Sequence, residues 1–207
     1  MTGDEPGRHD PGAALARLDE ITRLLRRECP WDREQDERSI VPHTVEEAYE
    51  LADAAHAGDD AKLLDELGDV LFQVYFLALL MEERGRGSLA EVADHCREKL
   101  IRRHPHVFGD RSADTAGQVV RNWNEIKRQD ERGGEIFGEI PETLPSTTYA
   151  KKILKRAASA GHEPQPDGDD PGDRLLMAVR EAVGAGEDPE LALRRAAARF
   201  RDRVEAR

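Results

Sequence analysis

Residues 66–81 read ELGDVLFQVYFLALLM, and they carry the clearest structural signal in the chain. Between Val70 and Met81 the apolar run is interrupted only by Gln73. We predict one long helix over about residues 61–84, because glycine-rich turns stand on either side of it. A helix that is apolar on nearly every side must be covered on nearly every side. We therefore expect core on one side of its second half and a subunit interface on the other.

The rest of the chain also favours helices. Ala, Leu, Glu and Arg dominate, and aromatic residues are only 5% of the 207 residues, which argues against a large sheet. Further helices are predicted over residues 13–27, 44–57, 88–103, 115–131, 147–160, 173–183 and 189–205. The predicted fold class is all-α, a four-helix-bundle-like domain with a C-terminal helical appendage.

The composition changes along the chain, and this predicts its domains. Residues 1–12 are polar and rich in glycine and proline, so we expect disorder there. Residues 13–132 hold the main helical domain. After Gly133 and Gly134, Pro141 and Pro145 bracket a linker. Residues 133–207 are therefore predicted to be a linker followed by appended helices.

Charge and cysteine usage exclude several classes of protein. A net charge of -12 is a poor match for nucleic acid, which binds basic surfaces. The apolar run from Val70 to Met81 is twelve residues long, too short to span a bilayer, so no membrane is expected. Cys29 and Cys96 form no CxxC pair, and no apolar segment opens the chain. We expect a cytoplasmic location.

Two pairs of carboxylates stand out on the predicted helices. Glu47 lies three residues before Glu50, and Glu66 lies three residues before Asp69, so each pair shares a helix face. Both faces also carry apolar residues, where an unpaired charge is costly. Residues 44–69 contain nine acids and one base, Lys62. If the two helices pack antiparallel, four carboxylates converge and require a cation.

Spacing alone leaves a second interpretation open. The pairs Glu34/Glu37 and Glu91/Asp94 have the same spacing on solvated faces. Thr44 and Glu47 also fit a capping box, and Glu46, Asp65 and Glu66 fit surface charge at helix starts. If a metal binds, carboxylate oxygens favour Mg²⁺ or Mn²⁺ over Zn²⁺. A di-iron bundle is disfavoured because no convincing Glu-x-x-His pair occurs.

A basic cluster follows, consisting of Arg97, Lys99, Arg102, Arg103, His104 and His106. Basic residues that accompany a metal-carboxylate site indicate a polyphosphate ligand. They equally suit a helix C-terminus, where cations face the helix dipole. Trp123 suits either base stacking or the core. No Walker-type loop is present, so no P-loop holds the phosphates.

The chain resembles a known family through several motifs in order. They are CPWD at 29–32, EEAYE at 46–50, ELGD at 66–69, KLIRRHPHVFG at 99–109, and Asn122-Trp123 with Ile126-Lys127. Over about residues 13–131 the chain is similar to the MazG-type nucleoside triphosphate pyrophosphohydrolases. The resemblance implies an all-α enzyme that works as a homodimer or a larger homo-oligomer.

The resemblance also implies an activity and its residues. It implies Mg²⁺-dependent hydrolysis of a nucleoside triphosphate to the monophosphate and pyrophosphate, which we interpret as a house-cleaning activity. By motif, the metal-binding and catalytic residues are Glu47, Glu50, Glu66 and Asp69. Lys62, Lys99 and Arg103 would contact phosphates, and Trp123 would lie against the nucleoside. Residues 13–132 would be the catalytic domain.

The chain departs from longer members of that family, which carry a second similar domain. Residues 172–179 and 189–200 look like remnants of its last helices. Glu139/Glu142 and Glu187/Glu190 lack a partner pair of acids on a second helix. We therefore predict no second active site after about residue 135. Two rival functions stay open: a catalytically silent helical module that binds nucleotides or proteins, and an enzyme specific for one nucleotide such as phosphoribosyl-ATP or dUTP.

Overall fold

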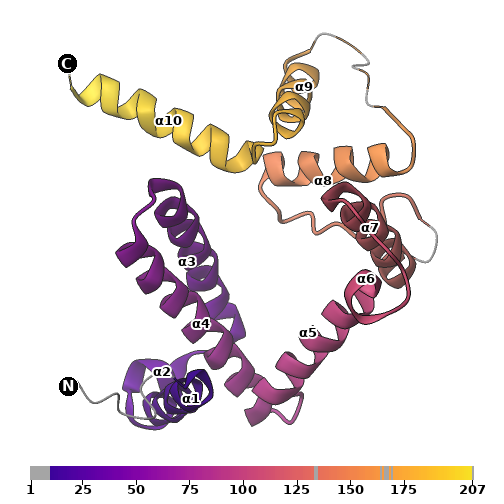
Figure 1. Ribbon diagram of the computed structural model, residues 1–207. Coiled ribbons are helices and arrows are strands. Elements are labelled where there is room, and N and C mark those ends of the chain that lie inside the picture. The colour runs from indigo at the N-terminus through magenta and orange to yellow at the C-terminus, as the bar shows by residue number, and fades with distance from the viewer. Residues whose placement is uncertain (1–9, 133–134, 164, 166–167, 169, 207) are drawn as a thin grey trace, which may run out of the picture. The chain divides into compact units, whose positions relative to one another are not determined.

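The computed structural model describes residues 10–132, 135–163, 165, 168 and 170–206, with backbone alone for 128–132. Every regular element in these ranges is a helix, which confirms the all-α class (Figure 1). The helices are α1 (Pro11–Glu28), α2 (Pro30–Glu34), α3 (Glu37–Ala57), α4 (Asp60–Glu83), α5 (Leu89–Arg103), α6 (Pro105–Phe108), α7 (Ala116–Arg132), α8 (Ser146–Ser159), α9 (Pro171–Gly184) and α10 (Pro189–Glu205). Among the described residues, no helix has the length and apolar character needed to cross a bilayer.

The chain divides into two compact units, residues 1–99 and 100–207. The first unit contains α1 to α4 and most of α5. The second contains the end of α5 and α6 to α10. The domain boundary that the sequence places after residue 132 stays a prediction.

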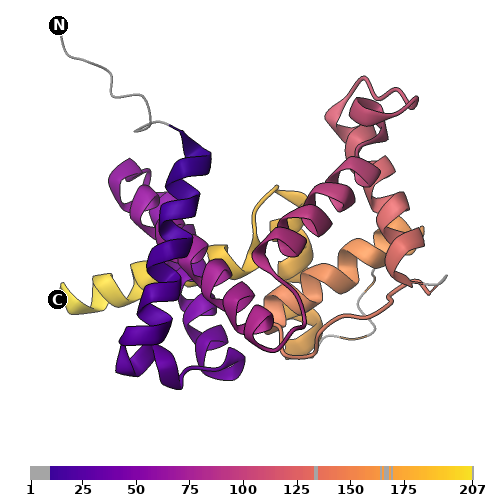
Figure 2. The same cartoon turned by 90° about the horizontal axis from the view of Figure 1, so that it is seen from below.

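Helices α3 and α4 form a hairpin, and this hairpin organises the first unit (Figures 1 and 2). Gly58 ends α3 with a φ of 70°, a left-handed conformation that glycine adopts without steric cost. Asp59 then caps α4, because its carboxylate accepts hydrogen bonds from the amides of Ala61 and Lys62 at 3.1 and 3.0 Å. One glycine and one aspartate thus turn the chain back within two residues. The predicted long helix matches α4 to within one residue at each end.

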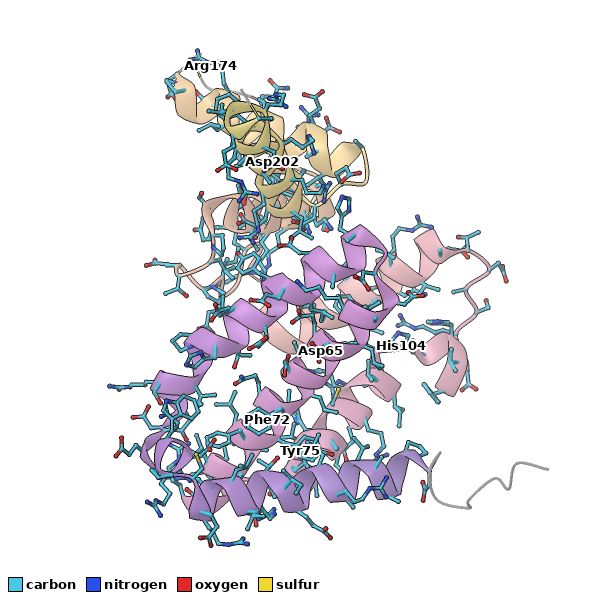
Figure 3. The ribbon with its side chains drawn as sticks, turned by 90° about the vertical axis from the view of Figure 1, so that its left-hand side faces the viewer. Asp65, Phe72, Tyr75, His104, Arg174 and Asp202 are labelled. Carbon is cyan, nitrogen blue, oxygen red and sulfur yellow. The ribbon has the colours of Figure 1, made fainter. Side chains whose placement is uncertain are left out.

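The apolar core of the first unit lies between α1, α3 and α4. Ile40, Phe76 and Leu80 are nearly inaccessible, and Phe72 packs against them. Phe72 and Tyr75 lie on the part of α4 beside α1 (Figure 3). The single chain therefore buries much of the apolar run on α4, although Val74 stays 39% exposed. The predicted subunit interface on the other side of this helix stays a prediction.

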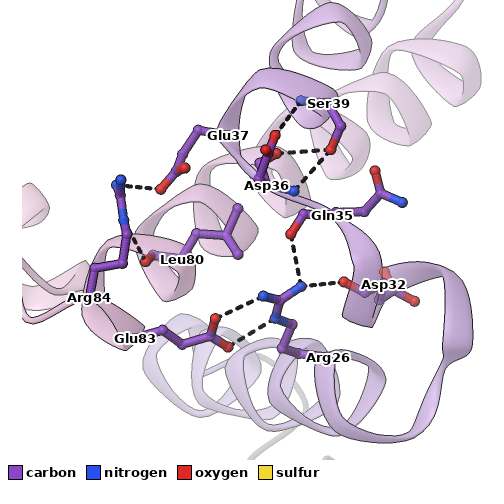
Figure 4. A network of polar contacts seen from close by, with 9 residues as sticks. All are labelled: Arg26, Asp32, Gln35, Asp36, Glu37, Ser39, Leu80, Glu83 and Arg84. Atoms are coloured by element: carbon purple, nitrogen blue, oxygen red, sulfur yellow. Dashed lines mark hydrogen bonds and ion pairs between the residues drawn. The ribbon is translucent and has the colours of Figure 1, made fainter.

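A polar network joins the ends of α1, α2, α3 and α4 (Figure 4). Arg26 makes two hydrogen bonds of 2.9 Å to Glu83 and also donates to the carbonyls of Asp32 and Gln35. Arg84 pairs with Glu37 and donates to the carbonyl of Leu80. Because these contacts satisfy backbone carbonyls at helix ends, the network fixes how the short helix α2 enters α3.

The start of α3 differs from the prediction. The helix begins at Glu37 rather than Thr44, and Pro42 lies inside it. Asp36 caps it, with reciprocal hydrogen bonds between Asp36 and Ser39. Thr44 is therefore an interior residue whose hydroxyl donates to the carbonyl of Ile40, and the capping box suggested for Thr44 and Glu47 is wrong.

Two smaller predictions also change. Residues 1–9 of the segment expected to be disordered lie outside the described residues, and α1 already begins at Pro11 after the cap Asp10. Residues 104–110, which lie outside the predicted helices, contain the single-turn helix α6. Pro105 suits its first position because a proline has no amide hydrogen to leave unpaired.

The appended helices of the second unit pack on one another, with α8 contacting both α9 and α10. Leu154 of α8 and Val179 of α9 are buried there. Asp188 caps α10 and Pro189 takes its first position. Lys151 of α8 forms an ion pair with the same Asp188, so one aspartate both caps α10 and joins it to α8.

Candidate functional site

The hairpin brings carboxylates from two helices to one place. Glu47 of α3 and Glu66 and Asp69 of α4 each present an oxygen within 4.8 Å of the others. The turn at Gly58 and Asp59 sets the register that places these side chains opposite one another. Across the described residues, no other group of three histidine, cysteine or acidic side chains comes together in this way. The convergence expected from the sequence is therefore present for three of the four acids.

Glu50, the fourth predicted ligand, is not part of this group of three. It lies one turn after Glu47 on α3 and is exposed. It is nevertheless close enough for its charge to raise the pKa of Glu47. Its role as a ligand stays a prediction.

The burial of the three acids differs, and Glu66 is the most enclosed. Only 4% of Glu66 is exposed, whereas Glu47 is half-buried and Asp69 is exposed. The pKa of Glu47 is raised, first by burial and then by the charges of Asp69, Glu50, Glu66 and Glu46. A pKa raised in this way shows that negative charge is crowded at the site, which attracts a cation.

Protein cations compensate little of this charge. Lys62, the one base between residues 44 and 69, has its Nζ 3.7 Å from Oε1 of Glu66. The Lys62 side chain is 51% exposed, so water screens the pair. One such contact leaves the acids of the group with an excess of negative charge.

A buried glutamine lies next to the acids and connects the two helices of the hairpin. Gln73 lies one turn after Asp69 on α4 and is 7% exposed. The hydroxyl of Thr44 donates to its Oε1 at 3.4 Å, which joins α3 to α4 next to the carboxylates. This contact depends on the early start of α3, which places Thr44 inside the helix.

The other acidic pairs with the same spacing behave differently. Asp94 pairs with Arg97 at 3.1 Å, and Glu91 accepts a hydrogen bond from Ser88 at 2.8 Å. Glu37 pairs with Arg84. Each of these acids has its own partner in the protein, whereas one half-exposed lysine, Lys62, faces the group of Glu47, Glu66 and Asp69.

The second unit holds a basic and aromatic cluster. The guanidinium of Arg103 lies 5.2 Å from the centre of the Trp123 ring, and Nζ of Lys127 lies 5.1 Å from it. Arg103 is buried, with 7% of its surface exposed. The structure therefore brings together two of the predicted substrate residues, Arg103 and Trp123. Lys99, half-buried one turn before Arg103 on α5, belongs to the first unit.

Sequence reasoning gave no role to Lys127. Its position four residues after Trp123 on α7 was the available signal, because that spacing places both side chains on one helix face.

Comparison with known proteins bears directly on this site. The sequence model of the MazG nucleotide pyrophosphohydrolase domain matches residues 35–108, a range that contains all four predicted ligands. The Thermotoga maritima protein named nucleoside triphosphate pyrophosphohydrolase/pyrophosphatase MazG is 36% identical, over 84% of this chain and 77% of that protein. The chain belongs to the MazG family. The resemblance seen in the sequence is thereby confirmed.

Other MazG relatives differ in how much they share with the chain. An uncharacterised 26.1 kDa protein of Streptomyces cacaoi is 40% identical over 97% of this chain and 86% of its own length. The nucleoside triphosphate pyrophosphohydrolase of Escherichia coli K12 is 42% identical over 65% of this chain, and the match spans 52% of that enzyme. A crystal structure of a MazG-related protein from Thermotoga maritima aligns at 26% identity with a TM-score of 0.48, covering 55% of this chain and 98% of that one.

Proposed function

We propose that this MazG-family chain hydrolyses nucleoside triphosphates to the monophosphate and pyrophosphate, with Mg²⁺ as the metal and Mn²⁺ as an alternative. The observation that carries the proposal is the convergence of Glu47, Glu66 and Asp69 within the matched region. The names of the relatives place this chemistry in the family. The silent-module alternative has no comparable observation in its favour.

The donor set fits a hard divalent cation. All three side chains offer carboxylate oxygens, and no sulfur or imidazole belongs to the group. Mg²⁺ prefers such oxygens and usually keeps part of its coordination for water and substrate phosphates. We infer that Glu47, Glu66 and Asp69 hold the metal, with Glu50 as a fourth ligand.

A divalent metal held by Glu47, Glu66 and Asp69 would neutralise the triphosphate charge and would lower the pKa of a water molecule. The carboxylates fix the position of this centre, because Glu66 is buried and α3 and α4 are joined through Thr44 and Gln73. In the reaction, the water oxygen attacks a phosphorus atom and the bond between the α- and β-phosphates breaks. A carboxylate oxygen of the cluster that does not contact metal accepts the proton of the water.

The substrate is held by residues outside the acidic cluster. We propose that Lys62, Lys99 and Arg103 contact phosphates, since each carries a positive charge and the substrate is a polyanion. Trp123 lies against the nucleoside. The stacked arrangement of Arg103 and Trp123 supports this assignment, because it presents a charge and an aromatic surface together. The active form is a homodimer or a larger homo-oligomer.

The test is pyrophosphate release from a panel of nucleotides. The panel contains the common ribo- and deoxyribonucleoside triphosphates, oxidised forms, dUTP and phosphoribosyl-ATP. We expect release that requires Mg²⁺ and stops when the metal is chelated. Activity on one nucleotide alone would favour the narrower enzyme, and no release from any of them would reject the proposal.

A further inference from the structure

The second unit contains a cavity that the acidic site does not use. Its volume is about 680 Å³, which falls within the usual range of about 300–1,000 Å³ for small-molecule sites. It is lined by residues of α7 and α8 and by His104. This histidine follows directly after α5 and is labelled in Figure 3. Its lining includes His104, Trp123, Lys127, Lys152, Lys155 and Arg156.

The lining of this cavity is positively charged. Four lysine and arginine side chains line it, and among the side chains that the structure describes no aspartate or glutamate does. The whole chain carries a net charge of -12, so the charge of the cavity lining is opposite in sign to that of the chain. Gathered cations repel one another, and a polyanion in the cavity would relieve that repulsion.

The lysines of α8 differ in what they contact. Lys151 pairs with Asp188 and joins α8 to α10. Lys152 and Lys155 lie three residues apart on the face that lines the cavity, and within the described part of the chain neither makes an ion pair. Arg156, one residue further, donates to the carbonyls of Phe137 and Glu139, which fixes its guanidinium at the cavity edge. Of the basic residues of α8, Lys152 and Lys155 are thus the ones available for a bound anion.

Trp123 gives the cavity an aromatic surface. The ring lies within reach of two cations, Arg103 and Lys127, so the positive charge continues around it. A ligand that matches both features carries several negative charges and a planar ring. A nucleoside triphosphate has both.

We propose that helix α8 supplies part of the substrate site, with Lys152 and Lys155 binding phosphates of the nucleotide whose base faces Trp123. This inference rests on the proposed function. It gives a binding role to a helix that lies outside residues 35–108, the region matched to the family. The appended helix α8 then serves the reaction.

The test compares two double variants of the full chain in a Trp31→Phe background, where Trp123 is the sole tryptophan. One is Lys152→Gln/Lys155→Gln. The matched control, Arg199→Gln/Arg203→Gln, removes the same charge from α10. Tryptophan fluorescence then measures binding of α,β-methylene analogues of ATP, GTP, CTP and UTP, of inorganic tripolyphosphate and of the free nucleosides.

We expect the lysine variant to raise the Kd of the triphosphate analogues and of tripolyphosphate by about 10-fold or more, since two charge-assisted contacts are lost. Nucleoside binding stays the same. The KM for hydrolysis rises in parallel while kcat changes little. The control variant matches the Trp31→Phe parent in all of these measurements. Lys155→Gln alone, at an exposed position, gives a smaller shift in the same direction if the double variant folds poorly.

An unchanged Kd for the triphosphate analogues would overturn the inference. Weaker analogue binding with an unchanged KM would also overturn it, because the cavity would then be separate from the substrate site. If the parent binds the analogues but releases pyrophosphate from no nucleotide, the proposed function fails. Weaker binding in the lysine variant would still support the cavity as a nucleotide site in that case.

Discussion

Glu66 is 4% exposed, and its nearest cation is the half-exposed Lys62 at 3.7 Å. A buried carboxylate with so little compensation destabilises a fold unless another positive charge reaches it. Glu47 and Asp69 add two further negative charges within 4.8 Å. A divalent cation is the simplest group that compensates all three, and this is why we place Glu66 at the centre of the account.

Replacing Glu66 with glutamine should therefore lower kcat/KM more than about 100-fold, the upper end of what indirect partners of a metal cost. The substitution keeps the shape of the side chain and removes its charge. Steady-state pyrophosphate release measures the effect. Asp94→Asn is the matched control, because Asp94 belongs to an acidic pair of the same spacing on an exposed face. Equal activity in both variants would argue against a metal at Glu66.

The raised pKa of Glu47 predicts how metal binding depends on pH. In metal-free protein, the folded state holds this proton more tightly than the unfolded state. The contribution of Glu47 to stability is then fully present below its unfolded pKa and is lost as pH rises through the raised value. Metal binding needs the deprotonated carboxylate, so stabilisation by Mg²⁺ should increase over the same pH range.

Thermal unfolding with and without Mg²⁺, from about pH 4 to pH 8, measures this. The increase in Tm caused by Mg²⁺ should grow with pH, and Glu47→Gln should reduce that growth. In metal-free buffer at pH 8 the same variant should unfold at a higher temperature than the wild type, because a repelling charge is gone. A Tm increase that is independent of pH would contradict the argument.

At the level of residues, spacing predicted the site well but not completely. Three of the four acids converge as expected. A step of three residues turns a helix by about 300°, so Glu50 is about 60° away from Glu47 around the axis of α3. Which of the two faces α4 more directly depends on how the helices cross, and the sequence does not contain that angle in readable form. The sequence suggested no role for Lys127, because this lysine lies outside the basic cluster of residues 97–106.

At the level of elements, α3 shows why local signals misjudge a helix start. Pro42 interrupts the backbone hydrogen bonds and argues for a later beginning. The cap at Asp36 and the burial of Ile40 outweigh that cost. Burial of Ile40 depends on contacts with Phe76 and Leu80 on another helix, so propensity alone does not reveal it. The ends of α4, by contrast, follow from the residues next to them.

Arg26 is expected to matter more to stability than Arg23, although both pair with glutamates of α4. The Arg26 side chain is 17% exposed and also donates hydrogen bonds to the carbonyls of Asp32 and Gln35. Arg26→Met should lower the free energy of unfolding by about 2–3 kcal/mol, since partly buried acceptors lose their donor. Arg23→Met, which removes a more exposed pair with Glu82, should cost less than about 1 kcal/mol.

Urea unfolding of the two variants distinguishes these values. Equal losses would mean that the network in Figure 4 contributes no more than an exposed ion pair. Arg23 pairs with two acids, Asp19 and Glu82, and Arg26 pairs with one, Glu83, so a larger loss in the Arg26 variant reports on its carbonyl contacts.

At the level of the whole molecule, exposed apolar side chains favour self-association. Single large hydrophobics on a surface are ordinary, but the helices of the first unit expose many of them. They are Leu15, Ile21, Leu24 and Leu25 of α1, Val41 and Val45 of α3, and Leu64, Leu67 and Val74 of α4. Sedimentation equilibrium should therefore give at least twice the mass of one chain. A monomer at micromolar concentration would contradict the proposed homodimer.

The proposed function requires above all that the acids of α3 and α4 bind a divalent cation. Electron paramagnetic resonance of Mn²⁺ titrated into the full chain tests it without any nucleotide. The wild type should bind Mn²⁺, and Glu47→Gln/Glu66→Gln/Asp69→Asn should lose that binding while remaining folded by circular dichroism. Mn²⁺ binding that is unchanged in the triple variant would contradict the account.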